Sequence, residues 1–231
     1  MRKMKRYEAD EYLIAFTEDF GKIGVTGKSI RKIKSKLRSS SELFCYSDIE
    51  FISGRKYNIL TDAETINSFS KIKKDLGKLS VGFRIAYMIA SFLPEEEKDD
   101  QLWEFILKSF SLLEGIDLEE GKDKKEQLRS FYYYFIFKFL GIIGYAPEIS
   151  NCLIDKKEGS VFSPREGGLV CELCSEKLKD PLKVKIKKED KVFLEKIFEL
   201  EFEEFIKEPP EFVKIGEVLQ NYMATLPSRQ S

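Results

Sequence analysis

The segment Asn151–Cys174 reads NCLIDKKEGSVFSPREGGLVCELC. It ends in a Cys-x-x-Cys pair, Cys171 and Cys174, and Cys152 lies upstream at a distance that suits a zinc knuckle. A structural zinc site normally takes four ligands from two such short pairs. Here the position that would complete the first pair holds Asp155, whose carboxylate is also a zinc ligand. The spacing therefore predicts a knuckle within residues 150–176.

Two interpretations of this knuckle stay open. Its three thiolates and one carboxylate form a four-ligand set for a structural zinc, or the knuckle is a metal-free relic held by hairpin contacts. The metal candidates are Cys152, Asp155, Cys171 and Cys174. A redox role for the Cys-x-x-Cys pair is disfavoured, because that motif needs a strand-to-helix setting and nothing in the sequence resembles one. Cys45, alone in a predicted strand, is interpreted as a small buried apolar residue.

The composition narrows the functional classes. The chain has 231 residues, enough for two small domains or one large one, and 42% of them are hydrophobic, which supports a real core. It has no histidine, which excludes Ser-His-Asp and Cys-His catalysis and imidazole metal sites. No apolar run reaches the roughly 20 residues of a membrane span, and the basic N-terminus lacks the apolar stretch of a signal peptide. We therefore expect a cytoplasmic protein with no membrane partner.

Charge is distributed unevenly along the chain. Residues 1–38 carry eleven lysines and arginines against five acidic residues, a net of +6, whereas residues 81–231 carry 22 against 29, a net of −7. A basic front on an acidic body is typical of nucleic-acid contact, although a solvated charged surface gives the same count. The candidate DNA-binding residues are the cations of this front: Arg2, Lys3, Lys5, Arg6, Lys28, Arg31, Lys32, Lys34, Lys36 and Arg38.

The densest part of this front is Lys28–Arg38, called the basic segment below, in which six of eleven residues are basic. Such a density neutralises several phosphates. An interpretation compatible with this is an exposed amphipathic helix whose Ile30, Ile33 and Leu37 pack on the neighbouring strands. Four aromatic residues nearby are candidates for base stacking but are more simply core: Phe16, Phe20, Phe44 and Tyr46.

The first third of the chain predicts a small β domain. Tyr12–Thr17 and Lys22–Thr26 are rich in β-formers and flank a turn at Asp19–Gly21, which indicates a hairpin. Leu43–Ile52 and Tyr57–Leu60 are two further strand candidates. Short antiparallel strands that bury one face suit a small barrel.

From about Ala63 the hydrophobic period becomes helical, and one helix face is predicted over Ile66, Phe69, Ile72, Leu76 and Leu79. Further predicted helices are Gly82–Leu93, Leu102–Leu113, Gln127–Ile143, Glu189–Phe205 and Val213–Met223. The expected class is α+β, with a β domain over residues 1–78 and a helical domain over residues 79–231 that carries the knuckle. Within it, the aromatic run Phe131–Leu140 is expected to be core. The alternative is a groove that receives an acidic, apolar peptide beside Arg129 or Lys138.

Taken together, these features resemble the RecO family of bacterial recombination mediators. The resembling segments are Tyr7–Asp10 leading to Phe16–Ile23, the basic stretch Gly27–Leu37, Leu140–Glu148, and Cys152 through Phe162-Ser163 and Gly167-Gly168 to Cys171-x-x-Cys174. The resemblance spans nearly the whole chain, and Leu140–Cys174 is its most specific part. The family usually has a complete Cys-x-x-Cys where this chain has Asp155. The roughly ten residues that usually supply its first barrel strand are expected to be either missing here or compressed into Met1–Arg6.

The resemblance implies an N-terminal OB-fold barrel and a helical domain with a zinc-knuckle element. It implies a non-enzymatic, nucleoid-associated role in DNA repair. RecO-like proteins bind single- and double-stranded DNA, anneal complementary strands, and act with a RecR-like protein to load RecA on strands coated by single-stranded-DNA-binding protein (SSB), whose acidic C-terminal tail they bind through the helical domain. The alternative from the residues alone is an interaction scaffold whose β domain binds protein, not DNA.

Overall fold

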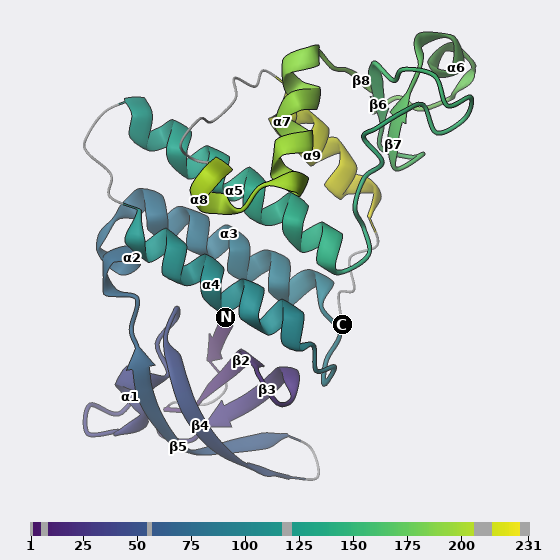
Figure 1. Cartoon of the computed structure of the whole chain (residues 1–231). Coiled ribbons are helices and arrows are strands. Elements are labelled where there is room, and N and C mark those ends of the chain that lie inside the picture. The colour runs from purple at the N-terminus through teal and green to yellow at the C-terminus, as the bar shows by residue number, and fades with distance from the viewer. Residues whose placement is uncertain (1, 6–8, 55–56, 117–121, 206–213, 227–231) are drawn as a thin grey trace. The chain divides into compact units, whose positions relative to one another are not determined.

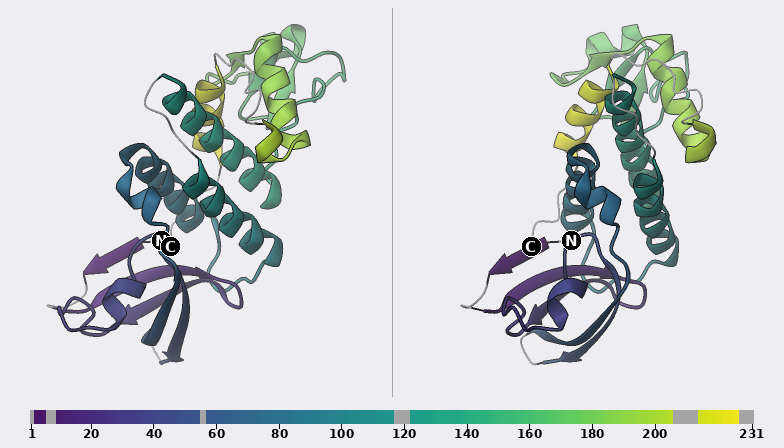
Figure 2. Two further views of the ribbon diagram at one scale, coloured as in Figure 1. Left: turned by 60° about the vertical axis from the view of Figure 1, so that its left-hand side comes forward. Right: turned by 90° about the vertical axis from the view of Figure 1, so that its left-hand side faces the viewer.

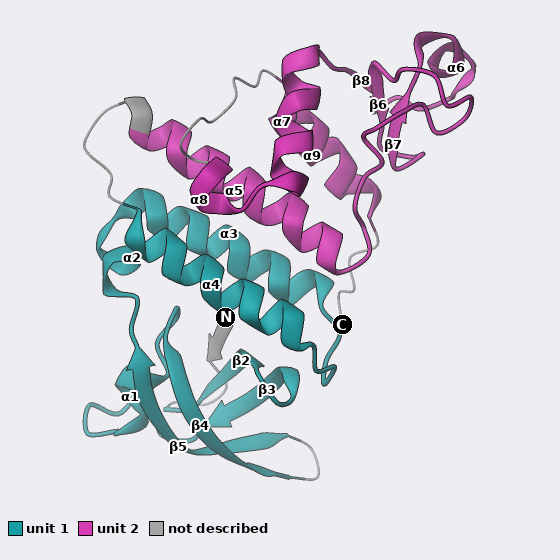
Figure 3. Cartoon of the chain, viewed as in Figure 1, with its two compact units in different colours: residues 1–118, 228–231 teal, residues 119–227 magenta. Residues whose placement is uncertain are grey.

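The structure is a computed structural model, and it describes residues 2–5, 9–54, 57–116, 122–205 and 214–226. Within these ranges the chain forms two compact units, one within residues 1–118 and one within residues 119–227 (Figure 3). Each unit has its own core. The predicted domain boundary at residue 78 falls inside the first long helix after the sheet, which spans Leu76–Phe92. The two units divide between residues 118 and 119, after the next long helix.

The first unit is built on a five-stranded sheet of order β1-β2-β3-β5-β4 (Figure 1). Its strands are, in chain order, β1 (Arg2–Lys5), β2 (Glu11–Thr17), β3 (Gly21–Gly27), β4 (Tyr46–Ser53) and β5 (Asn58–Asn67). The β3 and β5 strands run parallel, and the other neighbouring pairs are antiparallel. This order is that of an OB-like barrel, so the predicted α+β class with an N-terminal OB-like region is confirmed.

The β2–β3 hairpin forms where the sequence predicts it. Gly21 has a left-handed φ of +63°, and a Cβ at this position would overlap the carbonyl oxygen of Glu97. Thr17 closes the turn, because its hydroxyl accepts a hydrogen bond from the Phe20 N–H (3.1 Å) and donates one to the Gly21 carbonyl (3.0 Å). Any side chain at position 21 would therefore disturb both the turn and its packing.

The helix predicted from Ala63 onward is wrong at its start. Residues 63–67 belong to β5, which stays paired with β4 as far as Asn67, and Ile66 is 57% exposed. Helix α2 (Ser70–Lys74) follows, and Asp75 then caps a new helix by accepting the Lys78 N–H at 3.0 Å. Pairing between β4 and β5 thus overrides the helical spacing of the hydrophobic residues at the start of the predicted helix.

Two long helices complete the first unit and lie side by side beyond the sheet (Figures 1 and 2). They are α3 (Leu76–Phe92) and α4 (Asp100–Gly115). Trp103 on α4 joins them to the sheet, since its ring centroid lies 6.0 Å from Phe16 and 5.9 Å from Tyr46. All three rings are half-buried, so Phe16 and Tyr46 pack within the unit but are not the fully buried core residues that the simpler interpretation expects.

The second unit is mainly helical. Its longer helices are α5 (Lys122–Ile142), α7 (Lys188–Glu199) and α9 (Ile215–Thr225), and the single-turn helix α8 (Phe202–Phe205) follows α7. The helix predicted over Glu189–Phe205 is therefore interrupted, between α7 and α8. The aromatic run of α5 is core as predicted, because Phe131, Phe135, Phe137 and Phe139 are all buried. In the described part of the chain, no helix is both long enough and apolar enough to cross a membrane.

A small sheet of order β7-β6-β8 carries the knuckle. Its strands are β6 (Val161–Ser163), β7 (Gly168–Val170) and β8 (Val184–Lys185), and α6 (Glu172–Lys177) follows β7 directly. The β6–β7 hairpin pairs Val161 with Val170. Both residues are buried next to Cys152 and Cys171, so the hairpin brings the two halves of the cysteine pattern together.

Candidate functional site

The basic segment leaves the end of β3 and presents its charges to solvent. All six of its cations are exposed: Lys28, Arg31, Lys32, Lys34, Lys36 and Arg38. Ile30 holds the start of the segment, since only 1% of it is exposed and it packs in the barrel core with Leu13 and Val25. The segment is therefore a cationic surface fixed to the barrel.

The expectation of an amphipathic helix over this segment is wrong. The backbone forms successive turns, and α1 is helical only over Leu37–Ser40. Leu37 does pack against the barrel core, but Ile33 is 89% exposed. The spacing of Ile30, Ile33 and Leu37 suggested one buried face, and the turns rotate the middle residue out of it.

The N-terminal cations are described only in part. Arg2, Lys3 and Lys5 lie on β1, which pairs with β2, so a short first strand is present and is not missing. The side chains of these three residues lie outside the described part of the chain, as does Arg6. Among the stacking candidates, Phe44 is buried, whereas Phe20 is 53% exposed on the β2–β3 turn and packs edge-on against Phe51 at 5.3 Å.

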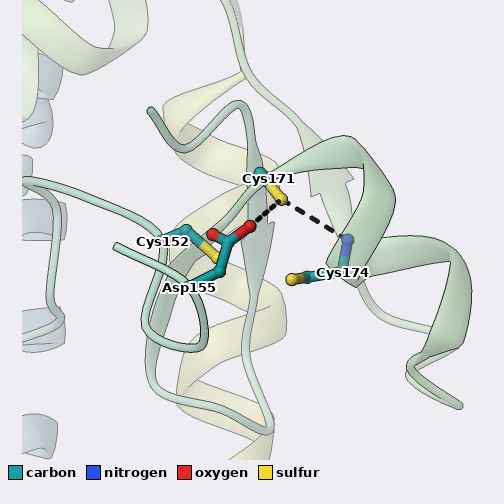
Figure 4. A group of neighbouring side chains, drawn as sticks. All are labelled: Cys152, Asp155, Cys171 and Cys174. Atoms are coloured by element: carbon teal, nitrogen blue, oxygen red, sulfur yellow. Dashed lines mark hydrogen bonds between the residues drawn. The ribbon is translucent and has the colours of Figure 1, made fainter. Parts of the chain in front are cut away.

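The four metal candidates of the knuckle point toward one another (Figure 4). Their ligand atoms, three sulfurs and a carboxylate oxygen, all lie within 4.8 Å of one another. Cys152 is fully buried, Cys171 is buried, Cys174 is half-buried and Asp155 is on the solvent side. The donor set is thus close enough to hold a metal ion.

Two tight turns give the cluster its shape. In the first, the Lys156 N–H donates to the Cys152 carbonyl at 2.9 Å, and the Lys157 N–H donates to Oδ1 of Asp155 at 3.2 Å. In the second, Cys171 is the N-cap of α6, and its Sγ accepts the Cys174 N–H at 3.4 Å. Each turn places two ligands on the same side of the backbone, as a knuckle requires.

Within the cluster, the pKa of the carboxyl group and the pKa of one thiol are shifted in opposite directions. The hydrogen bond from the Cys152 thiol, assisted by Lys157 and Cys171, lowers the pKa of Asp155 to about 2. Partial burial, followed by hydrogen bonds with the other two thiols, raises the pKa of Cys174 to about 12. Lys157 was missed in the sequence, although its Nζ lies 3.6 Å from Oδ2 of Asp155. The sequence signal for Lys157 was its position two residues after Asp155, the residue that replaces the expected cysteine.

Cys45 lies apart from this cluster. It is half-buried in the first unit and not fully buried as expected. Its Sγ accepts a hydrogen bond from Nζ of Lys73 at 3.2 Å, and Lys73 also pairs with Glu42 at 3.1 Å. The remaining cysteine therefore has no part in the four-ligand set and provides a control for it.

The two peptide-binding candidates on α5 differ in their surroundings. Lys138 is half-buried, and its Nζ donates to the carbonyl of Phe198 at 3.1 Å and lies 5.6 Å from the ring centroid of Tyr134. Arg129 is exposed and pairs with Glu126 one turn earlier at 3.6 Å. Only the second of these cations is presented on the surface.

Two family models match this chain in succession. The model described as "Recombination protein O N terminal" matches residues 1–69, and the one described as "Recombination protein O C terminal" matches residues 73–225. The chain belongs to the RecO family. Membership confirms the resemblance and places this RecO-family chain in DNA repair, as a recombination mediator and not as an enzyme.

Individual RecO proteins agree with this assignment. The "DNA repair protein RecO" of Dehalococcoides mccartyi is 32% identical over 178 residues, which cover 75% of this chain and 67% of that protein. The protein of the same name from Caldanaerobacter subterraneus subsp. tengcongensis is 29% identical over 175 residues, covering 75% of this chain and 68% of that protein.

Proposed function

We propose that this RecO-family protein binds single- and double-stranded DNA through the basic segment and anneals complementary strands. The observation that supports this most strongly is the exposure of all six cations on a segment held by the barrel core. Arg2, Lys3, Lys5 and Arg6 are proposed to extend the same surface. Strands held on it lose part of their mutual repulsion and meet at a raised local concentration, so they pair faster. The protein makes and breaks no covalent bond in this process.

The proposed partners follow from the mediator role. With a RecR-like protein, the chain would help RecA load onto strands coated by SSB. The acidic tail of SSB would bind the second unit, with Arg129 and Lys138 as its candidate cations. Arg129 is the better placed of the two, because its exposed pair with Glu126 is of a weak kind that an external carboxylate can replace.

We also propose that Cys152, Asp155, Cys171 and Cys174 hold a structural zinc. Four donors from two tight turns match a structural zinc site, in which a fully protein-ligated ion contributes to folding. When bound, the ion would crosslink the two turns and make the thiols deprotonate. Its role would be to fix β6, β7 and α6 as one element.

The substituted ligand gives the first prediction. Asp155→Cys should raise zinc affinity, because a fourth thiolate suits zinc better than a carboxylate at the same spacing. Competition with a chromophoric chelator measures this affinity. Glu158→Cys, an exposed acid in the same loop, is the matched control and should leave the affinity at the parental value. An Asp155→Cys protein with parental affinity would show that position 155 is not a ligand.

The experiment that tests the proposed function is annealing of two complementary labelled oligonucleotides across a salt series. The protein should accelerate annealing, and the acceleration should fade as salt rises, because the counterions released from the phosphates gain less free energy when the bulk salt concentration is high. No acceleration, together with no retention of single strands at low salt, would contradict the proposal. The β domain would then be the protein-binding scaffold considered as the alternative.

A further inference from the structure

The basic segment is anchored on both sides of its middle. At its start, the Ser29 N–H donates to Oδ1 of Asp10 at 2.7 Å, and the Arg31 N–H donates to the carbonyl of Ala9 at 3.1 Å. At its end, Leu37 packs against the barrel core. The residues between these anchors therefore have a defined backbone path and are not a loose tail.

The apex of this path is a turn with an isoleucine near its tip. The Lys32 N–H donates to the Ser29 carbonyl at 3.0 Å, and the Ser35 N–H donates to the Lys32 carbonyl at 3.0 Å. The second of these bonds closes a turn whose two central residues are Ile33 and Lys34. Ile33 is 89% exposed there, whereas Ile30 in the same segment is 1% exposed.

A single exposed isoleucine is common on protein surfaces and by itself indicates nothing. What distinguishes Ile33 is its surroundings, since exposed cations lie on both sides of it in the sequence, Arg31 and Lys32 before it and Lys34 after it. A polyanion attracted to these cations places its phosphates around the isoleucine. The sugars that link those phosphates carry the bases, whose faces are apolar enough to cover the side chain.

We propose that Ile33 inserts between neighbouring bases of a single DNA strand that the basic segment holds. Apolar side chains inserted next to phosphate-binding cations unstack bases in other DNA-binding proteins. The β-branched side chain suits this role, because its χ1 is stiff and little rotamer freedom remains to be lost. The inference rests on the proposed DNA binding and adds to it a contact with the bases.

Insertion at this point has a consequence for annealing. A step opened by Ile33, with its phosphates held by Lys32 and Lys34, would present its two bases apart and ready to pair. The cations would then supply the affinity, and the isoleucine would supply the rearrangement of the bases.

The test compares the parent with Ile33→Ser and with Leu76→Ser. Leu76 is the matched control, because it is an apolar residue of the same unit, 84% exposed and also close to lysines in the sequence. The probe is a single-stranded oligonucleotide that contains 2-aminopurine, whose fluorescence rises when its base is unstacked. Because both side chains are exposed, both variants should keep the parental circular dichroism and melting midpoint.

The parent and Leu76→Ser should raise the 2-aminopurine fluorescence on binding, and Ile33→Ser should not. Ile33→Ser should also bind up to about tenfold more weakly at fixed salt, from the lost apolar contact. Its dependence of log affinity on log salt should stay parental, because no phosphate contact is removed.

Parental fluorescence and affinity in Ile33→Ser would overturn the insertion while the proposed DNA binding still stands. If Ile33→Ser instead loses binding of an acidic peptide and keeps the DNA signals, the side chain serves a protein partner and the proposal is wrong. A parent that fails to bind the oligonucleotide at low salt would overturn the proposed function and the insertion together.

Discussion

Reversing three charges of the basic segment, in the variant Lys34→Glu, Lys36→Glu, Arg38→Glu, is expected to weaken single-stranded DNA binding on the order of a hundredfold at low salt. The three cations are exposed and lie on turns and on the first residues of α1, so their reversal should not unfold the barrel. Each lost phosphate contact lowers the slope of log affinity against log salt by about 0.7 for a single strand, so the slope should fall by about 2 in total.

A matched control separates this local effect from net charge. The variant Lys177→Glu, Lys179→Glu, Lys188→Glu makes the same change in net charge on three exposed lysines of the second unit. It should keep most of the parental affinity and the parental slope. Fluorescence anisotropy with a labelled oligonucleotide measures both quantities. If the first variant binds with the parental affinity and slope, the basic segment is not the DNA-binding surface.

Cys171→Ser is expected to remove the zinc and destabilise the second unit. Cys171 is buried and shares the cluster with Cys152, so its replacement would leave three of the four donors, while serine would still cap the start of α6. We expect the melting midpoint of this unit to fall by about 10 °C or more, because about 1 kcal/mol moves the midpoint of a unit of roughly 100 residues by about 4–8 °C. Elemental analysis and a thermal scan measure the two effects.

Cys45→Ser is the control for this loss of a thiol, because Cys45 lies in the other unit. It should keep one zinc per chain and the parental midpoint of the second unit. Treating the parent with a chelator should reproduce the midpoint of Cys171→Ser. A parent that is purified without metal and still melts at the same temperature as the chelator-treated protein would contradict the zinc proposal.

The sequence was sufficient for elements in which local chemistry and tertiary structure agree. Gly21 gives the β2–β3 turn a left-handed residue, and β-formers flank it, so the hairpin could be located to within a residue or two. The aromatic run of α5 is apolar on every side, which allows little besides a buried helix. For both features, the residues within a short window of sequence are enough to predict the structure.

The sequence was insufficient where distant pairing decides the structure. Ile66 fits a helical spacing with Ile72, yet it lies in β5, because pairing with β4 continues the strand past this residue. Ile33 fits the same kind of spacing with Ile30, yet the Lys32–Ser35 turn directs it to solvent. Hydrophobic periodicity indicates which side chains a segment would bury if it were a helix. It does not indicate which turns the segment forms when its ends are held by contacts with the rest of the unit.

The candidate site was predictable to different degrees. The spacing of the cysteines was enough to pair Cys152 with Asp155 and Cys171 with Cys174. What brings the two pairs together is the β6–β7 hairpin, and strands of three residues are too short to give a periodic signal. The salt bridge from Lys157 to Asp155 depends on the turn geometry, and the linear pattern gave it no weight.

The measurement that tests the central proposal most directly is the annealing rate of two complementary oligonucleotides at low and at high salt. It is made with the parent, the variant reversed at Lys34, Lys36 and Arg38, and the control reversed in the second unit. We expect the parent and the control to accelerate annealing at low salt and to lose this effect at high salt, whereas the segment variant should give close to the uncatalysed rate at both. Equal acceleration by all three proteins, or acceleration by the parent that does not depend on salt, would contradict the proposal that the basic segment neutralises DNA phosphates.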